Sequence, residues 1–380
     1  MRGARGLHGN QNQRGRCKVC DKWHCRCRSP FLRRTSQARE DRLNMALKAA
    51  NLPGGENDQQ TRVAYQTARG TMLHGKIEAA LISPQLQKQK GKINLIVTSP
   101  PFPLVRKKRY GNETGEAYLK WLESLAQPLA ELLTDDGSIV IEIGNAWEEG
   151  SPIMSTLPLE ALLAFKRAAK LNLCQHVICH NPARLPSPAA WVNLKRARLK
   201  DSFTHVWWMS KAKFPKADNR RVLNPYSKDM KKLLKRQSYN AGTRPSGHVI
   251  SEKGFLTDHG GSIGPNVLDL TGEHYPDALL KYTGTGWDKG YRTYCKDNEL
   301  APHPARMQSS LSAFFIQFLT DEDDLVLDPF GGSNTTGSVA EDLNRRWISV
   351  EADRGYVEGS LGRFPNVVAE AAAEGRTSYG

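Results

Sequence analysis

The chain has 380 residues, of which 24% are charged and 39% hydrophobic, and its formal net charge is +15. This length allows one large or two modest domains, and no stretch approaches the roughly 20 apolar residues that a membrane span needs. The basic N-terminus lacks the apolar run of a secretory signal and the seven cysteines are an odd number, so we expect a reducing, cytoplasmic compartment.

The positive charge is concentrated in two blocks. Residues 1–50 carry 13 Lys and Arg against 3 Asp and Glu, and residues 181–253 carry 17 against 4. The rest of the chain is acidic on balance. Two basic blocks on such a chain favour contact with a polyanion such as DNA. The alternative is a solvated surface with a disordered tail.

Residues 1–60 are rich in Arg, Gly, Gln and Asn and are expected to form a mostly disordered extension. A cysteine cluster lies within them: Cys17, Cys20, Cys25 and Cys27, with His24. Four thiolates in a closed tetrahedral site suit zinc, so the cluster is a possible structural zinc site. The alternative is a few reduced cysteines in a basic tail.

Strand and helix patterns alternate from about Arg62 onward. Helices are predicted over residues 75–82, 117–133, 157–171 and 313–319, and strands over residues 93–97, 138–143, 175–179, 325–328 and 347–351. Such alternation predicts a sheet rich in parallel strands, with helices on both faces.

The run Ile93–Val97 is followed by Thr98-Ser99-Pro100-Pro101-Phe102. Two prolines fix the backbone and remove two N–H donors, which leaves rigid carbonyl acceptors beside an aromatic ring. This corner suits an exocyclic amine on a flat heterocycle that stacks on Phe102; the alternative is an ordinary proline turn. Glu142 ends a neighbouring strand and is expected either to accept from the Ser99 hydroxyl or to face solvent.

A second motif combines a strand, a glycine turn and a helix start, and a further strand then ends in an acid. Its glycines let a ligand approach the backbone, and the terminal acid can accept hydrogen bonds from a ribose diol. The predicted cofactor residues are Asp328, Phe330, Gly331, Gly332, Ser333, Asn334 and Glu351. The alternative is a tight turn that binds no ligand.

Together these motifs resemble the DNA amino-methyltransferases of the β group, in which the catalytic motif precedes the cofactor motif. Ser-Pro-Pro-Phe is the form typical of cytosine-N4 enzymes, and the resemblance covers about residues 65–365. It implies a Rossmann-like methyltransferase fold with a mixed sheet of about seven strands and helices on both faces. It also implies S-adenosyl-L-methionine as cofactor and methyl transfer to N4 of a cytosine flipped out of double-stranded DNA.

The resemblance also implies the roles of several segments. The segment His303–Arg306 is similar to one that lies against the methionine end of the cofactor, although Arg306 has a structural role as its alternative, since Gln308 and Ser312 stand where prolines are expected. Segments 61–180 and 300–365 would form the catalytic and cofactor-binding halves, 181–299 the target-recognition region and 366–380 a tail. Arg184, Arg244 and His248 lie in segments that share the resemblance and are candidates for base or flanking contacts. By their charge, Lys195 and Arg198 are candidate phosphate contacts, and so are Arg106, Lys107 and Lys108 after the catalytic turn, with a solvated loop as the alternative for these three.

Three rival functions stay open at this point. An adenine-N6 enzyme of the same fold more often has Asp or Asn at the position of Ser99, and enzymes acting on RNA or on a protein amide usually show Asn-Pro-Pro-Tyr. A catalytically silent DNA-binding protein is disfavoured by the intact motifs. No cysteine of the catalytic region follows a proline, which disfavours cytosine-C5 chemistry. We expect a bacterial or phage-encoded, nucleoid-associated enzyme, with a cognate restriction endonuclease as a possible companion.

Overall fold

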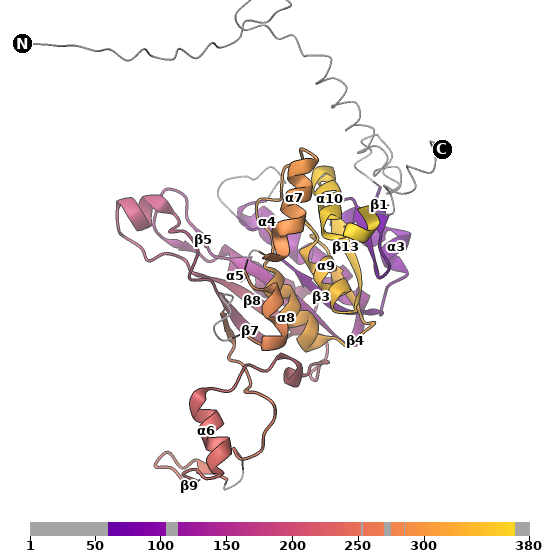
Figure 1. The fold of residues 1–380 in the computed structure, drawn as a ribbon. Coiled ribbons are helices and arrows are strands. Elements are labelled where there is room, and N and C mark those ends of the chain that lie inside the picture. Colours follow the sequence, from indigo (N-terminus) through magenta and orange to yellow (C-terminus); the bar gives the residue numbers. More distant parts are fainter. Residues whose placement is uncertain (1–59, 104–112, 252–253, 270–274, 285, 369–380) are drawn as a thin grey trace, which may run out of the picture. The chain divides into compact units, whose positions relative to one another are not determined.

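The computed structural model describes residues 60–103, 113–251, 254–269, 275–284 and 286–368 (Figure 1). The basic extension, its four cysteines and Arg106, Lys107 and Lys108 lie outside these residues. Among the described residues, no helix combines the length and the apolar character needed to cross a membrane.

A nine-stranded sheet forms the centre of this structure. Its order is β1(Arg62–Gln66), β2(Gly70–His74), β13(Arg346–Glu351), β12(Leu325–Asp328), β3(Ile93–Thr98), β4(Leu133–Gly144), β8(Phe203–Ser210), β7(Asn172–His180) and β11(Val267–Asp269). The five strands from β2 to β4 run parallel, and β8 is antiparallel to both of its neighbours. The carboxyl ends of β3, β4, β12 and β13 therefore meet at one edge of the sheet.

Helices cover both faces. One layer contains α2(Ile77–Ile82), α4(Gly115–Leu132) and α5(Leu157–Ala168), and the other contains α8(Ser309–Leu319) and α9(Thr335–Asp342). In α4, buried Leu122, Leu125 and Leu129 recur at three- and four-residue spacing, so one apolar stripe packs on the sheet. The core cluster joins this stripe to Ile96 of β3 and to Phe165 of α5.

The remaining elements are short. They are α3(Pro84–Gln87), β5(Ala146–Trp147), β6(Met154–Ser155), η1(Ala190–Leu194), η2(Asn219–Val222), α6(Lys228–Arg236), β9(Gly242–Thr243), β10(Val249–Ile250), η3(Asp277–Tyr282), η4(Gly286–Asp288), α7(Lys289–Asp297), α10(Arg354–Ser360) and η5(Leu361–Arg363).

The predicted fold class is confirmed, and two details differ from the expectation. The sheet has nine strands rather than about seven, because β1, which pairs antiparallel with β2, extends one side and the short β11 extends the other. In addition, β8 belongs to the main sheet although its residues fall in the segment assigned to target recognition. Its side chains Val206, Trp208 and Met209 are buried between the neighbouring elements.

The segment between β8 and β11 carries a separate lobe with α6 and the hairpin of β9 and β10 (Figure 1). Two reciprocal backbone hydrogen bonds close its base, from Asn224 N–H to the Ser262 carbonyl and from Ser262 N–H to the Asn224 carbonyl, each 2.9 Å. The lobe is thus an excursion of about residues 225–261 between two fixed points.

Candidate functional site

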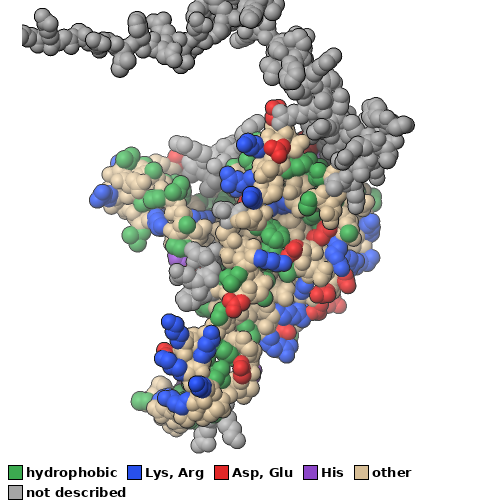
Figure 2. All heavy atoms as spheres, in the orientation of Figure 1, with side chains coloured by type: hydrophobic (Ala, Val, Ile, Leu, Met, Phe, Trp, Pro, Cys, Tyr) green, Lys and Arg blue, Asp and Glu red, His purple; other side chains and the backbone are tan. Residues whose placement is uncertain are grey.

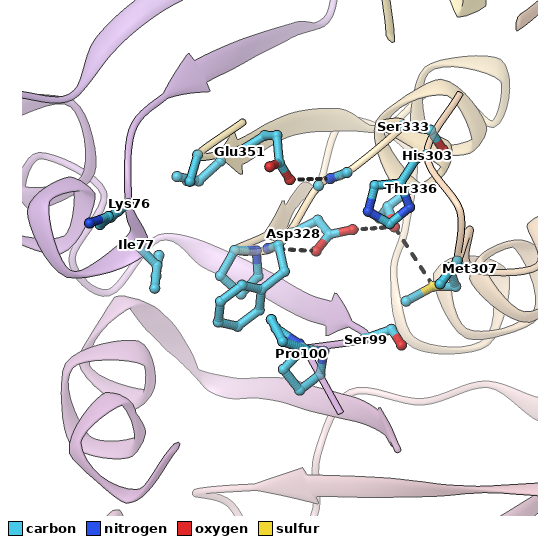
Figure 3. A pocket seen from close by; sticks show the side chains of 18 of the residues that line it. Lys76, Ile77, Ser99, Pro100, His303, Met307, Asp328, Ser333, Thr336 and Glu351 are labelled. Carbon is cyan, nitrogen blue, oxygen red and sulfur yellow. Dashed lines mark hydrogen bonds between the residues drawn. The ribbon is translucent and has the colours of Figure 1, made fainter. Parts of the chain in front are cut away.

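The two sequence motifs line one cavity at the carboxyl edge of the sheet. Its volume is about 470 Å³, and Ser99, Pro100, Pro101 and Phe102 line it together with most of the cofactor motif. From that motif the lining residues are Asp328, Phe330, Gly331, Gly332, Ser333 and Glu351, and Arg306 also lines the cavity. Figure 3 shows Glu351 at one end, Ser99 and Met307 at another, and Asp328 between them.

Asp328 joins the catalytic strand to the cofactor strand. Its Oδ1 accepts from the Thr98 hydroxyl at 2.7 Å and from the Phe330 N–H at 3.0 Å, and its Oδ2 accepts from the Thr336 hydroxyl at 2.7 Å. Burial raises the pKa of Asp328, while these three donors act in the opposite direction. Because Thr98 directly precedes Ser99, this carboxylate fixes the catalytic corner relative to the cofactor loop.

Glu351 is partly buried at the end of β13. Its Oε2 accepts from the Gly332 N–H and its Oε1 from the Asp353 N–H, each at 2.8 Å. Burial is the main cause that raises the pKa of Glu351 to about 7. Each oxygen keeps a lone pair for a further donor, so the carboxylate can accept from two hydroxyls in the cavity.

Gly332 has a φ of +52° and passes close to the ring of His303. A Cβ at this position would lie 3.3 Å from His303 Nε2, so the backbone conformation favours glycine and a side chain would also press on the ring. Burial is also the main cause that lowers the pKa of His303 to about 4, which keeps the ring neutral at physiological pH. The loop and the ring thus form one wall that is closely packed and carries no charge.

Phe102 lies against the end of β4. A Cβ on Gly144 would be 2.6 Å from Phe102 Cε2, so the absence of a side chain at Gly144 makes room for the ring. In the cavity wall, the Phe330 ring packs on Trp121 with centroids 5.6 Å apart, and Trp121 Nε1 donates to Glu78 at 2.7 Å.

Glu142 is partly buried behind the catalytic corner. The Thr204 hydroxyl donates to its Oε1 at 2.9 Å. Burial raises the pKa of Glu142, whereas the Thr204 hydroxyl, the Arg184 guanidinium and the Ser99 hydroxyl lower it. The carboxyl group is therefore not a solvent-facing acid, and it interacts with Ser99.

Two predicted cofactor residues have other partners in the protein. Asn334 does not line the cavity: its Oδ1 accepts from Gly337 N–H and from the Ser349 hydroxyl, and its amide donates to Tyr65. It is the N-cap of α9 in a left-handed conformation. Arg306 lines the cavity and also pairs with Asp288 at 2.8 Å.

The candidate DNA contacts fall into two groups. Arg184 and Arg198 are tied to the protein, since Arg184 donates to the Phe203 carbonyl and Arg198 to the Pro152 carbonyl and to Asp201. Lys195 lies over the Trp191 ring, with its Nζ 4.5 Å from the centroid.

Arg244 and His248 flank the turn between β9 and β10. The Arg244 N–H donates to the His248 carbonyl at 2.8 Å, so the turn brings the two residues together at the tip of the lobe.

Sequence reasoning missed several residues that shape this site. Thr204 lies in a strand whose basic flanks and tryptophans resembled a recognition segment. Asp288 and Arg363 are remote from both motifs, and no local pattern connects them with the cofactor loop. For Thr98, the signal was available, because it is the polar end of the strand that leads into the catalytic corner.

Comparison with known proteins agrees with this geometry. A family model described as DNA methylase matches residues 93–361. The type II methyltransferase M.PvuII of Proteus hauseri is 41% identical over 303 residues, which cover 79% of this chain and 85% of that protein. The orphan methyltransferase M.BamHII of Bacillus amyloliquefaciens is 26% identical over 73% of this chain and 90% of its own length.

A solved structure of the PvuII DNA methyltransferase, described as cytosine-N4-specific, superposes with a TM-score of 0.60 at 32% identity, covering 83% of this chain and 97% of that one. The resemblance predicted from the motifs is confirmed. This chain belongs to the N6/N4 DNA methylase family.

Proposed function

We propose that this chain is a site-specific DNA methyltransferase that transfers a methyl group from S-adenosylmethionine to the exocyclic N4 of a cytosine in double-stranded DNA. The observation that carries the proposal is the shared cavity: the Ser-Pro-Pro-Phe corner and the cofactor loop face the same space of about 470 Å³. The similarity to M.PvuII, whose solved structure is described as cytosine-N4-specific, supports the choice of base.

The cavity fits the proposed cofactor. The glycine turn lets the loop approach His303 closely, and Glu351 offers a partly buried carboxylate for the ribose hydroxyls. When bound, S-adenosylmethionine supplies an electrophilic methyl group on a sulfonium. The residues proposed to hold it are Asp328, Phe330, Gly331, Gly332, Ser333, Glu351 and Arg306, with Asn334 supporting the turn.

The catalytic corner would orient the amine. The lone pair of a cytosine amine is delocalised into the ring, so the amine is a poor nucleophile. Carbonyl acceptors at Ser99 and Pro100 can bind its hydrogens and favour a tetrahedral nitrogen aimed at the methyl group, while Phe102 stacks on the base. Glu142 lies behind Ser99 and would increase the electron density of the hydroxyl.

The target base is out of reach inside a duplex, so it must be flipped into the cavity. The lobe supports DNA contact: Lys228, Lys231, Lys235 and Arg236 are exposed on α6, and Figure 2 shows basic side chains gathered on it. We propose that α6 and Lys195 contact phosphates and that Arg244 and His248 read flanking bases.

Further partners, the compartment and a metal complete the proposal. The extension of residues 1–60 and, separately, Arg106, Lys107 and Lys108 would add phosphate contacts, and a cognate restriction endonuclease would cleave the same site without binding this chain. The compartment would be the nucleoid of a bacterial cell. The zinc at Cys17, Cys20, Cys25 and Cys27 also stays a prediction, to be checked by elemental analysis of protein purified without added metal.

The direct test is to express the full chain in cells without DNA methylation and to sequence their DNA with a method that detects N4-methylcytosine. Nucleoside mass spectrometry of the same DNA should show N4-methylcytosine, and N6-methyladenine in its place would overturn the base assignment. Ser99→Ala and Phe102→Ala should slow methyl transfer while cofactor binding persists. Phe214→Ala is the matched control, because this phenylalanine is 92% exposed.

A further inference from the structure

Asp288 connects two arginines that are distant in the sequence. Its Oδ2 accepts from Arg306 Nε and its Oδ1 from Arg363 Nη2, each at 2.8 Å. The Asp288 side chain is 24% exposed, that of Arg306 25% and that of Arg363 only 2%. The ring of Tyr291 lies beneath both guanidinium groups, with Cζ atoms 5.9 and 4.7 Å from its centroid. We call these three charged residues the Asp288 clamp.

Each arginine of the Asp288 clamp also binds the backbone of a different wall of the cavity, Arg306 that of segment 303–307 and Arg363 that of the loop at Ser333. Arg306 Nη1 donates to the His303 carbonyl at 2.7 Å. Arg363 Nε donates to the Ser333 carbonyl at 2.6 Å, and its Nη2 reaches the Ser333 hydroxyl at 3.0 Å. The carbonyl oxygen and the hydroxyl oxygen of Ser333 thus both accept from Arg363. Through Asp288 and Arg306, these bonds fix the orientation of the cofactor loop relative to segment 303–307.

These two walls lie at one end of the cavity. In Figure 3, His303, Ser333 and Met307 lie on the side opposite Glu351. If Glu351 binds the ribose, the amino-acid part of the cofactor extends toward the other end. A short displacement between segment 303–307 and the loop at Ser333 would then affect that part of the cofactor more than the ribose.

The electrostatics of the Asp288 clamp require the aspartate. Burial would raise the pKa of Asp288, but Arg363 and Arg306 outweigh it and lower the pKa overall, so the group is ionised at neutral pH. Without this carboxylate two guanidinium groups would lie side by side, one of them buried without an acidic partner. Such an uncompensated buried charge moves or recruits water.

Resting on the proposed function, we propose that Asp288 is a positioning residue that sets the subsite for the methionine end of S-adenosylmethionine. It touches neither cofactor nor DNA in this assignment. It acts by holding segment 303–307 and the loop at Ser333 at a fixed separation.

Two ligands separate this role from a general structural one. S-adenosylhomocysteine has both ends, whereas 5′-deoxy-5′-methylthioadenosine has the adenosine and thioether but no amino-acid end. Calorimetric titration of the full chain should show that Asp288→Asn lowers the affinity for S-adenosylhomocysteine by about tenfold or more, the factor expected for loss of a charged hydrogen-bond partner. The affinity of Asp288→Asn for methylthioadenosine should change by less than about twofold, whereas Glu351→Gln should lower the affinity for both ligands.

Asp321→Asn is the matched control. Asp321 also bridges two cations, Lys216 at 2.6 Å and Arg221 at 2.5 Å, but it does not line the cavity. Its substitution should leave the affinity for both ligands unchanged. If Asp288→Asn does not fold, Arg363→Lys applies the same test, because Arg363 does not line the cavity and lysine keeps the charge but not the paired hydrogen bonds to Ser333 and Asp288.

Equal weakening of both ligands, or no weakening of either, would overturn the role of Asp288. Failure of the wild-type chain to bind S-adenosylhomocysteine at all would instead overturn the proposed function, so the two failures are distinguishable.

Discussion

Cofactor binding should depend on pH through Glu351. Its pKa of about 7 in the folded protein lies above the ordinary value of 4.5, mainly because of burial. A ribose diol donates to the ionised carboxylate, so binding requires this group to lose its proton. The apparent Kd then rises as the pH falls below 7. Binding should be about tenfold weaker at pH 6 than at pH 8, a loss of ~1.4 kcal/mol in binding free energy.

The raised pKa of Glu351 makes the stability of the fold depend on pH in the opposite direction to cofactor affinity. Because the folded protein holds the proton more tightly than the unfolded chain, the contribution of Glu351 to stability is present below pH 4.5 and is lost as the pH rises toward 7. The ligand-free protein should therefore lose stability over the range in which cofactor affinity increases. Saturating ligand should offset this loss.

The assay is calorimetric titration with S-adenosylhomocysteine between pH 6 and 8. Glu351→Gln should bind more weakly at pH 8, by roughly 1–3 kcal/mol, and should show little pH dependence. His303 does not interfere, because its pKa of about 4 keeps it neutral over this range. A wild-type Kd that is constant from pH 6 to 8, or an equally steep dependence in Glu351→Gln, would refute the reasoning.

Gly144→Ala should displace the Phe102 ring, since the added Cβ would lie 2.6 Å from Cε2; single-turnover methylation should slow by the loss of base stacking worth roughly 1–3 kcal/mol, with unchanged cofactor affinity. Thr98→Val removes the 2.7 Å hydrogen bond to Asp328, and urea unfolding should show a loss of about 1–3 kcal/mol; no change would mean that the bond does not link the two strands. Removing residues 1–50 should weaken DNA binding most at low salt and flatten its salt dependence, because fewer counterions are released, while sequencing shows the same methylated site.

The strands that carry the chemistry could be predicted because each is short, apolar and ended by a distinctive residue. Ile93–Thr98 runs into two prolines, Leu325–Asp328 into a glycine turn, and Arg346–Glu351 into an acid. Such local signals fix the type of element and the residues at its end. The observed meeting of all three ends then follows from the parallel order of the sheet.

The parts that could not be predicted depend on contacts between distant segments. β8 joins the sheet because its backbone pairs with β4 on one side and β7 on the other and its side chains are buried on the faces of the sheet, whereas its sequence is surrounded by lysines and arginines. Asn334 has the side chain of a ligand-binding residue, but its position as a left-handed N-cap directs its amide into the protein. No pattern near Asp288 indicates that two arginines from later segments will bind it.

The closed base of the lobe has a consequence for how such an enzyme acquires new specificity. Because Asn224 and Ser262 are joined by two backbone hydrogen bonds, the chain leaves and re-enters the framework at nearly the same point. Insertions, deletions or whole replacements between them alter the lobe without shifting the strands on either side. The segment proposed to read DNA can therefore be exchanged by recombination while the framework of the sheet is inherited intact.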